Sequence, residues 1–159
     1  MVHTDKIVKD LELLHEGVFD LKELLNIIKE FFKRHDYDLT EKSYNSTTKD
    51  GLKTTVLKWD FDRKVDDYNQ CFAKLSIELN NYKEGFVDAK KVIDGRLKFV
   101  INAEIQRDYD QKWKTNPLRK IARAVYDRYV IEEKQDRVSK ELKSIIDNLK
   151  KEIKQYLGI

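Results

Sequence analysis

The 159-residue sequence has little cysteine, proline or glycine, and it has no long apolar run. Cys71 is the only cysteine, so no disulfide can form within the chain, and one proline with five glycines excludes a long flexible linker. No apolar stretch approaches the roughly 20 residues of a transmembrane helix, and residues 1–10 mix acids and bases where a secretory signal would be apolar. We therefore expect one soluble domain, residues 1–159, with a cytoplasmic location and no transmembrane segment.

Neither sign of charge dominates the sequence. The net charge of +3 is too small to indicate nucleic-acid binding from composition alone, and 40% apolar with 38% charged residues is typical of a globular domain. The basic residues are nevertheless concentrated locally, because residues 111–126 contain five bases and no acid. This segment is the one candidate for an electrostatically biased surface.

The sequence also lacks the motifs of common catalytic, cofactor and metal sites. It contains no His-Glu-x-x-His, Gly-rich phosphate loop, Gly-x-Ser-x-Gly or Cys-x-x-Cys, and its three histidines are not at ligand spacing. The carboxylate pairs at 60/62 and 108/110 suggest a cation site or a glycosidase, but the first pair adjoins Arg63 and Lys64. We therefore predict no catalytic residue, metal or cofactor, and the sequence favours a non-enzymatic role. Cys71, on an alternating apolar face, is interpreted as a buried structural residue.

Residues 1–35 are predicted to form a helical N-terminal segment. A short helix between Thr4 and Gly17 is indicated by apolar residues three and four apart, namely Ile7, Val8, Leu11 and Leu14, although a strand also fits this segment. A second helix, residues 21–34, is better marked, because Asp20 and Glu23 form a capping box. Its apolar stripe must pack against another element.

Residues 37–110 are predicted to form an antiparallel sheet of five strands. Apolar residues alternate with polar ones over 71–79 and 97–105, a period that indicates strands with one buried face. Turns are predicted at Asp50-Gly51, at residues 80–85 and at Asp94-Gly95, with a fourth strand over 86–93.

Residues 116–157 are predicted to form a helical C-terminal segment that opens at Asn116-Pro117. A phase change in the apolar stripe favours two helices joined near residues 131–136 over one long helix. The fold class is therefore predicted as α+β: a curved antiparallel meander of about five strands, packed on one face by an N-terminal helix and one or two long C-terminal helices.

The leading functional hypothesis is a non-enzymatic binding or assembly module with two contact surfaces. The first is the basic helix start at 111–126, which we expect to bind an anion or a partner through Lys112, Trp113, Lys114, Arg119, Lys120 and Arg123. The second is the amphipathic helix at 138–157, predicted to self-associate through Leu142, Ile145, Leu149 and Ile153. The expected partners are another protein or a second copy of the chain, with nucleic acid or an anionic membrane surface as weaker candidates.

Two alternatives stay open at this point. A curved sheet folded around a long terminal helix resembles, in outline, the helix-grip folds that hold apolar ligands, which implies a small-molecule carrier or an enzyme with a cavity between sheet and helix. That cavity is predicted to be lined by Leu75, Ile77, Phe99 and Ile101, with at least one convergent polar group. The other alternative is a nucleic-acid-binding accessory protein that uses the basic segment.

Overall fold

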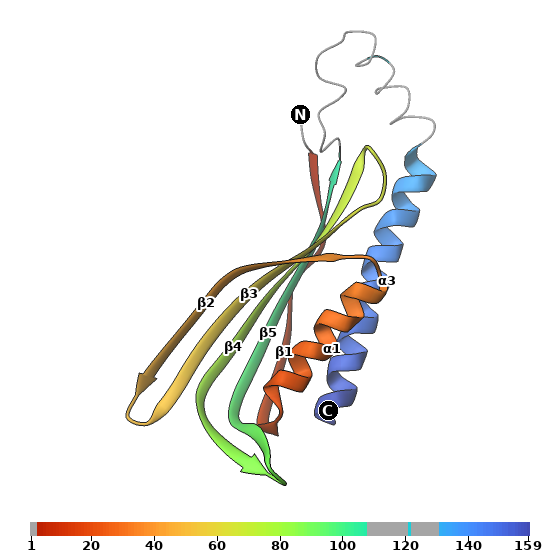
Figure 1. The fold of residues 1–159 in the computed structure, drawn as a ribbon. Helices are drawn as coiled ribbons and strands as arrows, with labels where there is room; N and C mark the ends of the chain where they lie inside the picture. Colours follow the sequence, from red (N-terminus) through yellow and green to blue (C-terminus); the bar gives the residue numbers. More distant parts are fainter. Residues whose placement is uncertain (1–2, 108–120, 122–130) are drawn as a thin grey trace.

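The computed structural model describes residues 3–107, 121 and 131–159, which are drawn in colour in Figure 1. The strands, in chain order, are β1 (His3–Phe19), β2 (Asp38–Lys49), β3 (Leu52–Lys64), β4 (Asn69–Val87) and β5 (Lys90–Arg107). Helix α1 (Leu21–Arg34) lies between β1 and β2, and helix α3 (Ile131–Leu157) ends the chain. Within the described ranges no helix has the length and apolar character needed to cross a membrane.

The five strands form one antiparallel sheet in the order β1-β5-β4-β3-β2. Strands β2 to β5 make a meander, and β1 pairs with the far side of β5. The sheet is open, with β1 and β2 as its two edges, and Figure 1 shows α1 and α3 on the same side of it. The predicted α+β class with a five-stranded antiparallel sheet is therefore confirmed.

A single hydrophobic cluster joins the inner face of the sheet to both helices. Residues at 71, 73, 75, 77 and 79 of β4 are buried, and so are those at 97, 99, 101, 103 and 105 of β5. This burial confirms the period-two pattern predicted for these two segments. The core therefore lies between the sheet and the helices.

Helix α1 begins and ends where the sequence predicted. The backbone N–H of Glu23 donates to the Asp20 side chain at 3.2 Å, as the capping box requires. The helix buries Leu24, Ile28, Phe31 and Phe32, and the Phe32 ring stacks on Phe61 of β3 with 3.9 Å between ring centroids. Its other end is fixed to α3, because Arg34 donates two hydrogen bonds to Glu152 at 2.8 and 3.0 Å.

Strand β1 replaces the helix predicted between Thr4 and Gly17. The register of β1 on β5 slips twice, between Lys6 and Val8 and between Val8 and Leu11. Each slip is a β-bulge, which places an extra residue opposite the partner strand. Val8 and Leu11, three residues apart, therefore pair with Ala103 and Ile101, which are only two residues apart. The three-residue spacing that suggested a helix is thus the spacing of a bulged strand.

The hairpin that joins β4 to β5 turns at Asp88-Ala89, not at Asp94-Gly95. Val87 pairs with Lys90, and the two intervening residues have φ angles of 51° and 65°, as a two-residue turn with left-handed backbone requires. The turns predicted at 80–85 and 94–95 and the separate strand at 86–93 are therefore wrong, because both strands run through these positions. The Asp50-Gly51 turn, by contrast, is confirmed, with φ angles of 54° and 78°.

Gly95 has a different role, opposite a β-bulge in β4. Asn80 pairs with Arg96 and Lys83 with Asp94, so two residues of β4, Asn81 and Tyr82, face Gly95 alone. The extra residue turns the buried Tyr82 side chain onto the inner face of the sheet. A Cβ atom on Gly95 would lie 2.5 Å from the Cβ of Tyr82, so only glycine permits this approach.

Helix α3 spans Ile131–Leu157 without a break, so residues 131–136 are helical and hold no join. The helix predicted to precede it from Asn116-Pro117 lies outside the described residues, apart from Ile121. The four residues predicted for self-association are at most 6% exposed and belong to the core of this one chain. The stripe packs against the chain's own sheet and α1, and self-association through it stays a prediction. These residues are Leu142, Ile145, Leu149 and Ile153.

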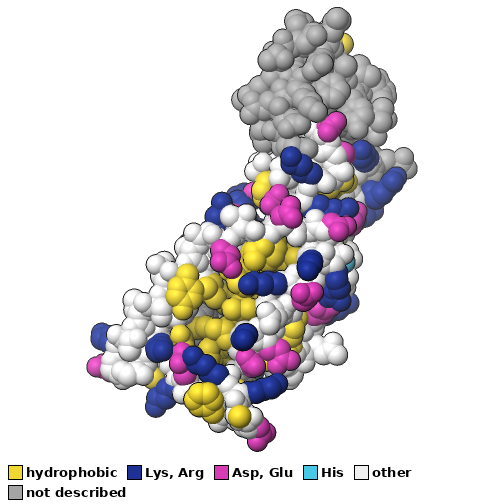
Figure 2. All heavy atoms as spheres, in the orientation of Figure 1, with side chains coloured by type: hydrophobic (Ala, Val, Ile, Leu, Met, Phe, Trp, Pro, Cys, Tyr) yellow, Lys and Arg dark blue, Asp and Glu magenta, His cyan; other side chains and the backbone are white. Residues whose placement is uncertain are grey.

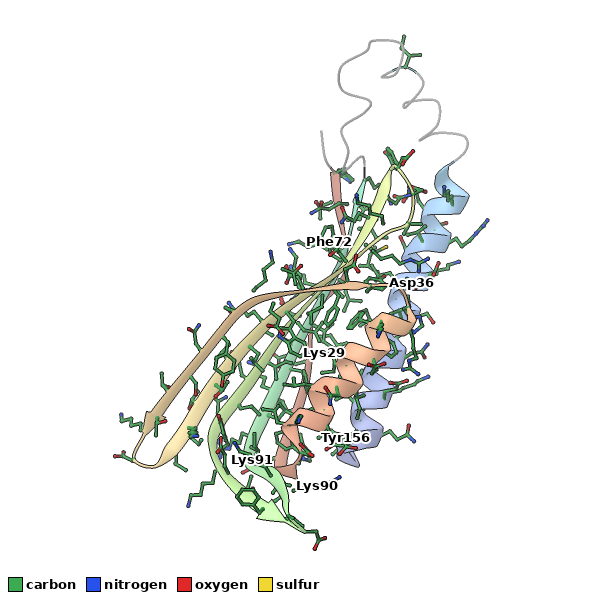
Figure 3. All side chains as sticks on the ribbon, viewed as in Figure 1. Lys29, Asp36, Phe72, Lys90, Lys91 and Tyr156 are labelled. Atoms are coloured by element: carbon green, nitrogen blue, oxygen red, sulfur yellow. The ribbon has the colours of Figure 1, made fainter. Side chains whose placement is uncertain are left out.

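The end of α3 is fixed to the start of α1 by Tyr156. Its hydroxyl group accepts a hydrogen bond from the backbone N–H of Asp20 at 3.2 Å and donates one to the backbone oxygen of Asp20 at 3.1 Å. Figure 3 shows Tyr156 beside the first turn of α1. Helix α1 is thus held to α3 near both of its ends.

Candidate functional site

The candidate site is an open groove between α1 and the inner face of β2–β5. It consists of two adjoining hollows of about 590 and 440 Å³, which share Leu25 of α1 and Tyr44 of β2. Figure 2 shows apolar side chains exposed between α1 and the strands, with basic side chains along the margins. We call it the α1 groove.

The register between β2 and β3 determines which side chains form the floor of the groove. Tyr44 pairs with Leu57, and Ser46 pairs with Thr55, so these four side chains share the inner face of the β2–β3 hairpin. Leu57 and Thr55 are buried, whereas Tyr44 is 66% exposed at the edge of the groove. Figure 1 shows that the β2–β3 hairpin extends beyond α1, and residues of its inner face line both hollows.

Thr55 and Tyr82, two buried residues that line the larger hollow, belong to a chain of hydroxyl groups that ends at the exposed Ser46. The oxygen atoms of Thr55 and Tyr82 are 2.7 Å apart, and the Thr55 hydroxyl donates to that of Ser46 at 3.0 Å. Because Thr55 donates to Ser46, the Tyr82 hydroxyl donates to Thr55. The bulge at Asn81 therefore delivers a polar group into an otherwise apolar wall, where it is held by a specific partner.

Replacing Thr55 with valine is expected to destabilise the fold by about 1–2 kcal/mol, because the Tyr82 hydroxyl would lose its buried partner. Valine keeps the shape of threonine, so the change isolates the hydrogen bond. The free energy of unfolding in urea measures the effect. Adding Tyr82→Phe should recover most of the loss, since both polar partners are then gone; a double variant as unstable as the sum of the single ones would contradict this account.

Glu84 organises the charges at one margin of the larger hollow. Its carboxylate lies 3.1 Å from the Lys53 ammonium group and 3.1 Å from that of Lys91. These two hydrogen-bonded lysines lower the pKa of Glu84 below its usual range. Glu84 therefore stays ionised near neutral pH and is a poor proton acceptor.

The smaller hollow is aromatic. Trp59 is buried in its floor, and the Lys29 ammonium group lies 5.1 Å from the centre of the Trp59 ring. Lys29 also pairs with Glu41 across the hollow at 3.8 Å. A flat apolar surface with a cation above it can accept an apolar or aromatic group.

The structure brings together few of the residues that sequence reasoning had selected. The basic segment 111–126, with its six candidate binding residues, lies outside the described residues except for Ile121, whose side chain is exposed. Anion or nucleic-acid binding by that segment therefore stays a prediction. The residues predicted to line a central cavity, Leu75, Ile77, Phe99 and Ile101, are instead buried in the hydrophobic core.

The acidic residues near the β3–β4 loop make structural contacts. Asp62 accepts a hydrogen bond from Gln70, and Asp66 accepts from the backbone N–H groups of Tyr68 and Asn69. Asp66 also pairs with Lys134 of α3 at 2.6 Å. In residues 3–107 and 131–159 no group of three histidine, cysteine or acidic side chains is arranged to hold a metal ion.

Cys71 is buried, as predicted, and is not a reactive thiol. Burial raises its pKa to about 11, and a hydrogen bond with Tyr37 opposes that effect only in part. The same burial raises the pKa of Tyr37 well above its usual range. Both groups are therefore neutral near pH 7 and serve the packing of the core.

Sequence reasoning missed the residues that form the α1 groove. Tyr44, Thr55 and Leu57 lie in segments whose side chains alternate between the two faces of a strand. That alternation predicts which face a side chain is on, but it does not distinguish a face that lines an open groove from a face packed in the core. Tyr82 lay in a segment interpreted as a turn, because the bulge interrupts the alternation. Comparison of the chain with protein-family models, curated proteins and solved structures found no match.

Proposed function

We propose that the chain is a non-enzymatic binding protein that holds a small amphipathic molecule in the α1 groove. The observation that carries this proposal is the groove itself, with hollows of about 590 and 440 Å³ that meet at Leu25 and Tyr44. Sites for small molecules are typically hollows of about 300–1,000 Å³, lined by apolar and aromatic groups with a few polar ones. The proposal keeps the small-molecule carrier that the sequence left as an alternative, but it places the ligand in the α1 groove and not in a cavity between the sheet and the C-terminal helix.

The lining of the groove supports an amphipathic ligand. Leu25, Leu57 and Trp59 provide an apolar floor, whose coverage by a ligand would remove apolar surface from water. The lysines of the margin supply polar contacts at the sides. A ligand with an apolar body and one polar end matches this division.

Binding is favoured over acid–base catalysis by the state of the two acidic residues that line the larger hollow, Glu84 and Asp20. Glu84 is held ionised by Lys53 and Lys91, whereas a general base has a pKa near the working pH. The other carboxylate in this hollow, Asp20, accepts the capping hydrogen bond of α1. Both acids therefore have structural partners.

Replacing Tyr44 with serine is expected to weaken the binding of decanol, a neutral amphipathic probe, by about tenfold, which corresponds to about 1.4 kcal/mol. Tyr44 touches both hollows, and its loss removes an aromatic wall that the ligand would cover. Titration calorimetry on the full chain measures the dissociation constant. Because Tyr44 is 66% exposed, its truncation should leave the free energy of unfolding nearly unchanged.

Leu14→Ser is the matched control for this experiment. Leu14 is also 66% exposed, but it neighbours the buried Leu13 on β1 and therefore lies on the opposite face of the sheet. The control should bind decanol as the unaltered chain does. Equal weakening by both substitutions, or no binding of decanol to the unaltered chain, would contradict the proposed function.

A further inference from the structure

The walls of the α1 groove carry more lysines than acids. Five lysines line the two hollows, against three acidic residues. The lysines are Lys22, Lys29, Lys42, Lys90 and Lys91. The groove therefore presents an excess of positive charge to a ligand.

Three of these lysines already have an acidic partner. Lys29 lies 3.8 Å from Glu41, Lys91 lies 3.1 Å from Glu84, and Lys42 lies 4.0 Å from Asp60. For Lys22 and Lys90, in contrast, the part of the chain that the structure describes contains no ion pair. Among the described residues, Lys22 and Lys90 are thus the two groove lysines without a paired acid, and they share their hollow with the Asp20 carboxylate that caps α1.

Lys22 and Lys90 line the same hollow, together with the apolar side chains of Leu21, Leu25 and Ile93. Figure 3 shows Lys90, beside Lys91, at the end of the groove where α1 begins. The positive end of the α1 dipole lies at this place as well, and the Asp20 carboxylate neutralises part of it. An anionic group bound here would meet two lysines while its apolar body lies along the floor.

We propose that the α1 groove selects an organic anion with an apolar body, such as a fatty acid, and that Lys22 and Lys90 bind its acidic head group. This inference rests on the proposed function and names the class of ligand. The two ammonium groups would form charge-assisted hydrogen bonds with a carboxylate, which are stronger than those to a neutral hydroxyl group. The apolar chain would extend over Leu25 toward Trp59.

Two probes of the same length, decanoate and decanol, separate the head group from the chain. By titration calorimetry on the full-length protein, decanoate should bind about ten- to a hundredfold more tightly than decanol. In the double variant Lys22→Met/Lys90→Met this preference should disappear, while decanol binds as before, because methionine keeps much of the apolar stem. Raising the salt concentration should weaken decanoate binding to the unaltered chain only.

Lys58→Met is the matched control, because Lys58 is exposed and follows the buried Leu57 on β3, which places it on the opposite face. It should keep the preference for decanoate. Equal affinity for the two probes, or equal loss of both in the double variant, would overturn the assignment of Lys22 and Lys90 and leave the proposed function standing. Binding of neither probe would overturn both. Thermal unfolding of each variant checks that its fold is intact.

Discussion

The Leu149→Ala variant should lose about 2–5 kcal/mol of its free energy of unfolding. Leu149 is fully buried in the hydrophobic cluster that joins α3 to the sheet. Removing its side chain costs the transfer free energy of the deleted atoms and leaves a cavity that the surrounding side chains fill only in part. Urea unfolding followed by circular dichroism measures the loss.

Lys151→Ala provides the control on the same helix. Lys151 is exposed, and alanine is a good helix former, so this change should alter stability by no more than about 0.5 kcal/mol. Light scattering on the folded variants distinguishes a core position from an interface between copies. Leu149→Ala that kept full stability but lowered the molar mass of a native oligomer would show that the residue serves association after all.

Replacing Gly95 with valine should destabilise the fold by about 3 kcal/mol or more, at the upper end of the cost of overpacking. The added Cβ would lie 2.5 Å from the Cβ and 2.8 Å from the Cα of Tyr82. Since the second of these atoms belongs to the backbone, a change of rotamer cannot relieve the contact. The β4 bulge must move, and the partners of the Tyr82 hydroxyl would be displaced with it.

Gly85→Val tests whether that cost comes from the close approach rather than from losing a glycine. Gly85 is also within β4, and a Cβ there would meet no atom within 4 Å. Valine favours strands, so this variant should be as stable as the unaltered chain or slightly more so. Equal free energies of unfolding for the two valine variants would refute the contact at Gly95.

The sequence predicts those helices and strands whose apolar periodicity matches the face that is buried in the fold. Helix α1 has a cap and a single apolar stripe, and the segments 71–79 and 97–105 have unbroken alternation. In each case the buried face follows directly from the period. These elements are found where they were expected, and they fix the class of the fold.

The elements that sequence reasoning missed depend on β-bulges, which change the period of a strand without a distinctive residue pattern. Two bulges in β1 gave apolar residues a helical spacing, and the bulge at Asn81 made a continuous strand look like a turn. Asp94-Gly95 carried a strong hairpin signal, but the glycine was required for the approach of Tyr82. Only the pairing of strands distinguishes these cases.

The α1 groove was beyond prediction for a related reason. Its apolar residues have the same pattern as core residues, and whether a face is covered depends on where α1 ends relative to the β2–β3 hairpin. Lys22 and Lys90 are 68 positions apart in the sequence, and nothing local relates them. The basic cluster that did stand out in the sequence is contiguous, which is why it attracted the first hypothesis.

The two hydrogen bonds between Tyr156 and the Asp20 backbone span 136 positions. During synthesis, Asp20 emerges long before Tyr156, so the first turn of α1 lacks this anchor until α3 has also been made. Helix α1 is therefore fixed at its start only after all five strands of the sheet have been translated.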